Sequence, residues 1–276
     1  MSNFINLKKY ISIGAFSKLS GISRKNLIYY NDIGILKPAL VKENGYRYYS
    51  YNQLDEVSII LSLKDLDVPL KDIKTYLDNI SENNLLELIS NQKKKILEEL
   101  NRLNQMNYII EQRTKNVNMI SNINCNDIFL ENCTEEVLFL GPDHIFSNSD
   151  DDLEEDFANF LDYCYSKKIL YGYPVGVYSK YNAAFSDTPF SYNYFYKLPS
   201  DMDYIEKTIK PCGLYVIAYD NSYLADDFKI FQRIDDYIIK NNLSVCGDVY
   251  VENISDEIIT KSPNKYLSKI SVQVKK

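Results

Sequence analysis

The sequence predicts a multidomain protein of α and α+β class, in which a winged helix-turn-helix, a coiled-coil helix and a duplicated α+β domain follow one another. Three observations predict this fold. A hairpin signal follows two short helices, apolar residues repeat every seventh place in the middle of the chain, and a β-α-β-β order occurs twice beyond that repeat. We place the three domains at residues 10–80, 81–121 and 122–276.

Two short helices joined by a tight turn are predicted at the start of the chain. Ser12 is a candidate cap of the first helix, and Gly21 supplies the turn. The second helix has Ser23 as its candidate N-cap and stops at Gly34. Such a pair is typical of a helix-turn-helix, which places the first turn of its second helix in the major groove of DNA. The side chains in and just beyond that turn that can contact phosphates or base edges are Ser23, Arg24, Lys25, Tyr29 and Tyr30.

A hairpin is predicted at the stretch NGYRYYS, because an Asn-Gly pair between strand-like residues is the strongest short-range hairpin signal. Arg47 stands among tyrosines on this wing. Its guanidinium can lie on the DNA backbone while tyrosine hydroxyls, including that of Tyr46, contact phosphates. Some of these tyrosines must instead pack the wing onto the domain, and we expect Tyr48 or Tyr49 to do so.

A long helix is predicted over residues 85–118, after two further helices of which the second has Pro69 at its first position. One row of this helix is apolar at every seventh residue: Ile89, Ile96, Leu103, Ile110 and Val117. A second row contains polar residues: Leu86, Lys93, Leu100, Asn107 and Thr114. The alternative is an amphipathic helix packed on its own domain. Five unbroken heptads favour a dimeric coiled coil.

Composition and charge restrict the class of protein. No apolar run reaches the length of a membrane span, the N-terminus lacks a signal-peptide pattern, and five irregularly spaced cysteines suit reduced thiols, so we expect a cytoplasmic protein.

The net charge of −7 is uneven: residues 1–80 carry +3, residues 81–120 carry +1 and residues 121–276 carry −11. One end of the chain can therefore face a polyanion while the other repels it.

The C-terminal part is predicted to fold as one α+β domain with antiparallel strand pairs, because its β-α-β-β order occurs twice. Residues 121–276 hold 16 of the 25 tyrosines. Strand alternation places Tyr192, Tyr194 and Tyr196 on one face of a strand. Tyrosines suit planar, lipophilic and often cationic ligands, although we expect about half of them to belong to the core.

The N-terminal part resembles the winged-helix DNA-binding domain of the MerR family of bacterial transcription activators. The resemblance covers roughly residues 10–80 and rests on the combination of YY-x(3)-GIL-x-P with GYRYY. It implies a homodimer, formed through the 85–118 helix, on promoter DNA that ligand binding distorts so that RNA polymerase can use it. The chain departs from the family at Ile28, where members usually carry Arg. This departure weakens basal affinity or moves the role of that Arg to Lys25.

The C-terminal part resembles the GyrI-like effector-binding domain of the multidrug-sensing, BmrR-like subgroup. The similarity includes SYNYF, LYVIAYD and DVY, and it implies the pocket residues Tyr171, Tyr192, Tyr250 and Tyr266. Those sensors carry a buried glutamate directly after the DVY tyrosine, where this chain has Val251. Three interpretations stay open: Glu252 reaches the pocket through a bulge, Asp187 or Asp220 substitutes for it, or the ligand is neutral.

Three other functions remain as alternatives: metal sensing, drug sequestration and enzymatic activity. Cys125 and Cys133 have a spacing similar to that of copper-type MerR members and suit soft ions, but two cysteines are a weak signal and His144 completes no ligand set. A drug-sequestering protein with secondary control of DNA is a further alternative. No enzymatic motif is present, and relatives of the GyrI-like domain that hydrolyse small molecules use the glutamate that is missing here. We therefore expect no enzyme, no cofactor, no bound metal and no membrane partner.

Overall fold

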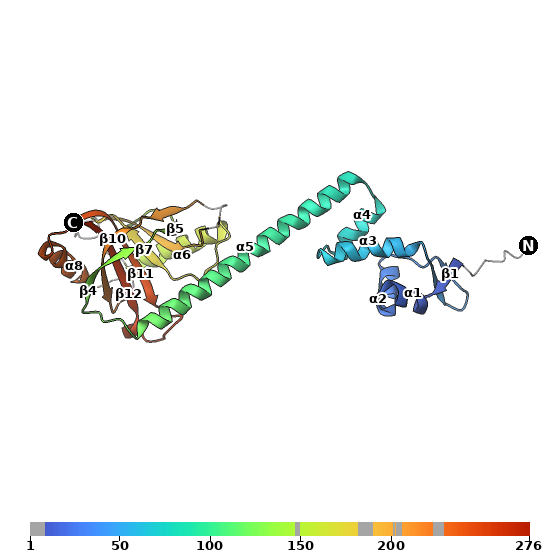
Figure 1. Ribbon diagram of the computed structural model, residues 1–276, viewed down its shortest axis with the longest axis horizontal. Coiled ribbons are helices and arrows are strands. Elements are labelled where there is room, and N and C mark those ends of the chain that lie inside the picture. Colours follow the sequence, from blue (N-terminus) through green and yellow to red (C-terminus); the bar gives the residue numbers. More distant parts are fainter. Residues whose placement is uncertain (1–8, 147–149, 182–189, 201, 203–205, 223–228) are drawn as a thin grey trace, which may run out of the picture. The chain divides into compact units, whose positions relative to one another are not determined.

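The structure is a computed structural model that describes residues 9–146, 150–181, 190–200, 202, 206–222 and 229–276. Two compact units divide the chain between Glu99 and Leu100. This boundary falls inside one long helix, so each unit contains part of it. Figure 1 follows the elements along the chain by colour. In the described ranges, no helix is both long and apolar enough to cross a bilayer.

The N-terminal unit contains the predicted helix-turn-helix. Its elements are β1 (Tyr10–Ser12), α1 (Ile13–Ser20), α2 (Arg24–Asp32), β2 (Leu40–Val41), β3 (Arg47–Ser50), α3 (Gln53–Asp65) and α4 (Leu70–Asp78). The Ser12 side chain caps α1 by accepting from the Ala15 amide, and the Ser23 side chain caps α2 by accepting from the Asn26 amide. Gly21 ends α1 with a φ of 72°, a conformation that glycine adopts at little cost. The predicted caps and turn are confirmed.

The wing is a hairpin of β2 and β3, and β1 adds a third antiparallel strand beside β3. Tyr49 on β3 is fully buried, stacks on Phe16 with ring centroids 4.5 Å apart, and donates its hydroxyl to the Leu27 carbonyl. Phe16 belongs to α1 and Leu27 to α2. Tyr49 thus fixes the wing to both helices, as expected for one of the two candidate tyrosines.

Helix α5 spans Glu82–Ile120, which is 39 residues and slightly longer than the predicted 85–118. Its apolar heptad row is exposed along the whole length of the helix: Ile89, Ile96, Leu103, Ile110 and Val117. Other residues of the helix pack on the unit to which they belong, with Leu85 and Leu88 against the N-terminal core and Tyr108 and Ile109 against a C-terminal core. No described part of the chain therefore buries the predicted row.

The C-terminal unit is built on one antiparallel sheet. Its strands are β4 (Ile128–Cys133), β5 (Glu136–Leu140), β6 (His144–Phe146), β7 (Gly176–Ser179), β8 (Phe190–Lys197), β9 (Thr208–Lys210), β10 (Gly213–Asp220), β11 (Ser244–Ser255) and β12 (Leu267–Lys275). The order in the sheet is β4-β10-β12-β11-β7-β8-β5-β9, and β6 pairs with β8. The order β10-β12-β11 mirrors β5-β8-β7 about the central β11–β7 pair, so the predicted duplication is confirmed.

Two helices cover one face of this sheet (Figure 1). Helix α8 (Lys229–Lys240) packs Ile234 on Val251 and neighbouring apolar residues, and α6 (Asp150–Ser166) packs Phe160 on Tyr194. Val251 and Tyr194 both pair with Val177 and so lie on the same face of the sheet. The opposite face carries a third cluster that includes Phe195, Tyr215 and Tyr250. This second face carries the charged groups described below.

Candidate functional site

The first turn of α2 presents the polar side chains that the helix-turn-helix predicts. Arg24 and Lys25 are exposed, and Ser23 is exposed while it caps the helix. Tyr29, one turn further on, is 51% exposed. Because charged donors at this position can reach phosphates and base edges, α2 fits the role of a recognition helix.

Tyr30 is corrected. It is 2% exposed and packs in the core of the N-terminal unit, while its backbone carbonyl accepts from the amides of Ile35 and Leu36. Helical spacing explains the difference, because Tyr30 follows Leu27 by three residues and shares its buried face. We therefore drop Tyr30 from the predicted DNA contacts and keep Tyr29.

The wing holds Tyr46 and Arg47 at its tip. Tyr46 is 63% exposed, and its amide donates to the Asn44 side chain that shapes the turn. Arg47 is partly buried, and its Nε atom has no hydrogen-bond partner among the described residues. Lys42 lies over the Tyr48 ring at 4.9 Å from the centroid. The wing therefore carries cationic and aromatic groups of the kind that contact the DNA backbone.

Glu252 lies on the face of β11 opposite to Val251. Pairing between β11 and β12 is regular from Val249 to Asn253, so no bulge is needed to place it there. Val251 points to the α8 core, whereas Glu252 shares the other face with Tyr250. Alternation along a regular strand thus carries this acid to the second face, and the interpretation that requires a bulge is wrong.

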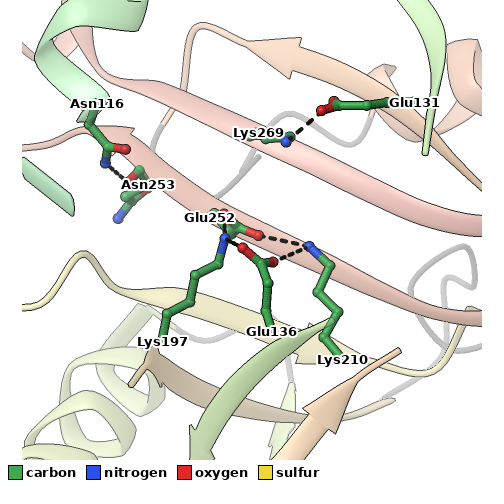
Figure 2. A network of polar contacts seen from close by, with 8 residues as sticks. All are labelled: Asn116, Glu131, Glu136, Lys197, Lys210, Glu252, Asn253 and Lys269. Carbon is green, nitrogen blue, oxygen red and sulfur yellow. Dashed lines mark hydrogen bonds and ion pairs between the residues drawn. The ribbon is translucent and has the colours of Figure 1, made fainter. Parts of the chain in front are cut away.

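Glu252 belongs to a square of four charges, shown in Figure 2, in which Glu252 and Lys210 are buried and Glu136 and Lys197 are partly buried. We call it the buried square. Lys197 Nζ lies 2.7 Å from Glu136 Oε1 and 2.6 Å from Glu252 Oε2. Lys210 Nζ lies 3.0 Å from Glu136 Oε2 and 3.1 Å from Glu252 Oε1. Each carboxylate therefore contacts both ammonium groups, and the two positive charges balance the two negative ones.

The pKa values of these groups follow from this pairing. Burial acts to raise the pKa of Glu252, but the ammonium groups of Lys197 and Lys210 outweigh burial and hold it below its ordinary value. Burial acts to lower the pKa of Lys210, but Glu252 and Glu136 outweigh it and raise that pKa. Both shifts favour the charged forms, so Glu252 and Lys210 stay ionised around neutral pH.

The predicted ligand tyrosines do not gather around Glu252. Tyr250 shares its face and is buried at 3% exposure. Tyr192 lies on the opposite face in the α6 core, where its hydroxyl donates to Asp156 Oδ2 at 2.8 Å. Tyr171 is 52% exposed, and Tyr266 is partly buried just before β12. Adjacent strand residues point to opposite faces, so the tyrosines of these strands cannot all line one cavity.

The other two candidate acids have different positions. Asp187 lies outside the described residues. Asp220 is the last residue of β10 and accepts from the Ser222 hydroxyl. The structure therefore gives Glu252, among the candidates that it describes, the buried position that a pocket acid needs.

A small cavity of about 60 Å³ lies beside Glu252. Its polar and charged lining residues are Gln112, Lys115, Asn116, Glu136, Lys197, Glu252, Asn253 and Lys269, and its apolar ones are Met119, Pro174, Phe195 and Ile254. A second hollow of about 430 Å³ shares Lys115 and Met119 with it and is also lined by Ile123, Phe129 and Tyr219. The C-terminal end of α5 thus lines both spaces.

Polar contacts fix this end of α5 on the sheet. Arg113 Nη1 lies 2.5 Å from Asp256 Oδ2, and Arg113 Nε donates to the Gly172 carbonyl at 3.1 Å. Asn116 Nδ2 donates to the Asn253 carbonyl at 3.4 Å, directly beside Glu252 on β11 (Figure 2). A molecule that enters the cavity must therefore contact α5 or move it.

Cys125 and Cys133 lie near the end of α5 and on β4. Cys125 donates to Asn221 Oδ1, and burial raises the pKa of both thiols. A raised pKa disfavours the thiolate that binds soft metals. Within the described residues, no group of three or more His, Cys, Asp or Glu side chains could hold a metal ion. His144 pairs instead with Asp156, at 2.8 Å. This geometry disfavours the metal-sensing alternative.

Comparisons with known proteins agree with the N-terminal fold. The profile described as MerR HTH family regulatory protein matches residues 11–80. Among solved structures, the cryo-EM structure of the EcmrR–DNA complex in EcmrR-RPo covers 96% of this chain and 100% of that chain, with 18% identity and a TM-score of 0.43.

Two curated proteins of Bacillus subtilis (strain 168) match along almost the whole chain. The multidrug-efflux transporter 2 regulator is 27% identical over 277 residues, which is 98% of both chains. The multidrug-efflux transporter 1 regulator is 25% identical over 288 residues, covering 97% of this chain and 99% of that protein. Residues 11–80 therefore match the helix-turn-helix of MerR family regulatory proteins, and the chain is related over its full length to regulators of multidrug-efflux transporters.

Proposed function

We propose that the chain is a ligand-responsive transcription activator that senses a lipophilic small molecule through its C-terminal unit. One observation carries this proposal: α5 begins in the DNA-binding unit and ends as a wall of the cavity beside Glu252. A ligand that changes the contacts of Met119 or Asn116 acts on the helix that continues into the other unit. The relatives named as regulators of multidrug-efflux transporters support a lipophilic ligand.

A homodimer formed through α5 is part of this proposal. The exposed apolar row of α5 is the surface that a partner helix needs, because knobs of a coiled coil repeat every seventh residue. Two copies of α2 and of the wing would then contact two half-sites of promoter DNA. RNA polymerase is the further partner that an activator requires. We propose a regulatory role without a catalytic step, and the domain boundaries at 10–80, 81–121 and 122–276 remain part of the proposal.

Arg47→Ala is expected to weaken promoter binding and to reduce its salt dependence. If each guanidinium of the dimer contacts one phosphate, the slope of log K against log[salt] falls by about two. Fluorescence anisotropy with a DNA fragment selected for binding, over a salt series, measures this slope. Lys64→Ala in the last turn of α3 is the matched control and should keep the wild-type slope. If Arg47→Ala binds the promoter as tightly as the wild type at every salt concentration, the wing does not belong to the DNA interface.

A further inference from the structure

The side chain of Arg24, the first residue of α2, lies across the first turn of α1. A β-carbon placed on Gly14 would lie 2.6 Å from Arg24 Nη2, 3.1 Å from Arg24 Cζ and 3.3 Å from Arg24 Nε. These distances are shorter than ordinary van der Waals contact, which is about 3.5–4.0 Å between carbon atoms. The guanidinium group therefore occupies the space that any side chain at position 14 would need.

Buried contacts fix the backbones that carry Gly14 and Arg24. Phe16 on α1 is fully buried in the core of the N-terminal unit. The Ser17 hydroxyl donates to the Ile22 carbonyl at 2.7 Å, which joins α1 to the turn before α2. Helix α1 therefore cannot move away from α2 without opening this core. A side chain at position 14 must instead displace the side chain of Arg24, which is exposed and can change its rotamer.

No carboxylate holds the Arg24 guanidinium in this place. Among the residues that the structure describes, the Arg24 side chain has neither an ion-pair partner nor a hydrogen-bond acceptor. A guanidinium group carries five N–H donors and a permanent positive charge. Because the described part of the chain uses none of these donors, they are available to an anion outside the protein. Packing against Gly14 is the contact that restrains them.

The geometry of a helix-turn-helix on DNA indicates which anion this is. The second helix of the motif enters the major groove, while the first helix crosses the sugar-phosphate backbone. A guanidinium group that extends from the first turn of α2 across α1 therefore lies at the border between groove and backbone, where phosphates are in reach. A long side chain that is already restrained there loses less conformational entropy when DNA binds.

We propose that Gly14 is a positioning residue for DNA binding, because its lack of a side chain lets the Arg24 guanidinium lie across α1 and contact a phosphate. This inference rests on the proposed contact between Arg24 and DNA, and it assigns a role to a residue outside α2. Alanine favours the helical conformation more than glycine does. Gly14→Ala therefore has opposite effects on the two properties: it favours the fold of α1 and weakens DNA binding.

Gly14→Ala in the full-length protein is expected to bind promoter DNA about tenfold more weakly than the wild type. The reason is that two unrestrained arginine side chains, one in each protomer of the proposed dimer, must then be ordered on binding. Fluorescence anisotropy with a DNA fragment selected for binding to the wild type measures the affinity. Urea unfolding followed by far-ultraviolet circular dichroism should give a midpoint equal to or above that of the wild type.

Two double-mutant cycles assign this loss to Arg24. In an Arg24→Ala background, Gly14→Ala should change DNA affinity by less than about twofold, because the group that it displaces is absent. Lys25→Ala is the matched control background, since Lys25 is the next cation along α2 while the three atoms nearest to the added β-carbon all belong to Arg24. The loss of about tenfold should persist there, because independent sites are additive.

The outcomes separate this inference from the contact on which it rests. Wild-type DNA affinity of Gly14→Ala would overturn the positioning role, and tighter binding would do so too, because the packing would then hold Arg24 away from DNA. A loss that persists in the Arg24→Ala background would show that the added methyl group itself obstructs DNA, which also overturns the inference. Wild-type affinity of Arg24→Ala alone would instead remove the Arg24 contact from the proposed function, and the inference with it.

Discussion

Lys210→Met is expected to destabilise the C-terminal unit by about 3–5 kcal/mol, because it leaves the buried carboxylate of Glu252 and the partly buried one of Glu136 with one ammonium group instead of two. Lys210 is 1% exposed, so water cannot replace the lost partner. Urea unfolding followed by tyrosine fluorescence measures the loss. The unit contains most of the tyrosines and the chain contains no tryptophan.

Two controls isolate the charge from the packing. Lys197→Met should cost less, because the side chain of Lys197 is 19% exposed whereas that of Lys210 is 2% exposed, so water can replace part of the lost partner. Lys210→Met combined with Glu252→Gln should recover part of the stability, since one carboxylate and one ammonium group then remain paired. An unfolding midpoint of Lys210→Met equal to that of the wild type would contradict the buried square.

The pH dependence of this effect has a definite sign. The carboxyl pKa values of Glu136 and Glu252 are lowered by folding, so their contribution is present above the ordinary value of 4.5 and is lost as pH falls through the lowered values. The pKa of Lys210 is raised, so its contribution is present below the ordinary value of 10.5 and is lost as pH rises through the raised value. The destabilisation by Lys210→Met should therefore be largest between these limits and shrink in acid.

Leu103→Asp combined with Ile110→Asp is expected to dissociate the dimer and with it to abolish tight promoter binding. Each dimer buries two copies of both side chains in the proposed coiled coil, and each copy contributes about 1.5–3 kcal/mol. The dimer dissociation constant should rise by at least about a hundredfold. Sedimentation equilibrium measures the association, and anisotropy measures the loss of DNA affinity.

Asn91→Asp combined with Asn101→Asp is the matched control for this pair, because it adds the same two negative charges to α5 at positions off both heptad rows. It should remain dimeric. If the doubly substituted chain sediments as the wild type does, the exposed row of α5 does not form the dimer interface.

The N-terminal half of the fold could be predicted from sequence because its signals are local. Ser12, Ser23 and Gly21 act within a few residues of their own positions, and the Asn-Gly pair determines its own hairpin. The heptad row likewise predicts one continuous helix, although the sequence does not show which residues beyond 85–118 extend it. Tyr30 was assigned wrongly, because its helical neighbours share a buried face that residue type alone does not reveal.

The candidate ligand site could be predicted only in part. Strand alternation correctly placed Tyr192, Tyr194 and Tyr196 on one face, but that face is buried by α6. The buried square was not predicted, because Glu136, Lys197, Lys210 and Glu252 come from four strands far apart in sequence. Only the pairing order of the sheet brings these strands together. The sequence offered one signal of the square: Lys197 is a charged residue at the end of an otherwise aromatic strand.

The claim that ligand binding beside α5 controls transcription can be tested directly by run-off transcription. Purified full-length protein, RNA polymerase and a DNA fragment selected for binding are mixed with increasing concentrations of a lipophilic probe that calorimetry shows to bind the protein. Transcript is expected to rise severalfold, with a midpoint near the dissociation constant of that probe, because binding and promoter state are linked. A probe that saturates the protein while transcript stays constant would contradict the claim.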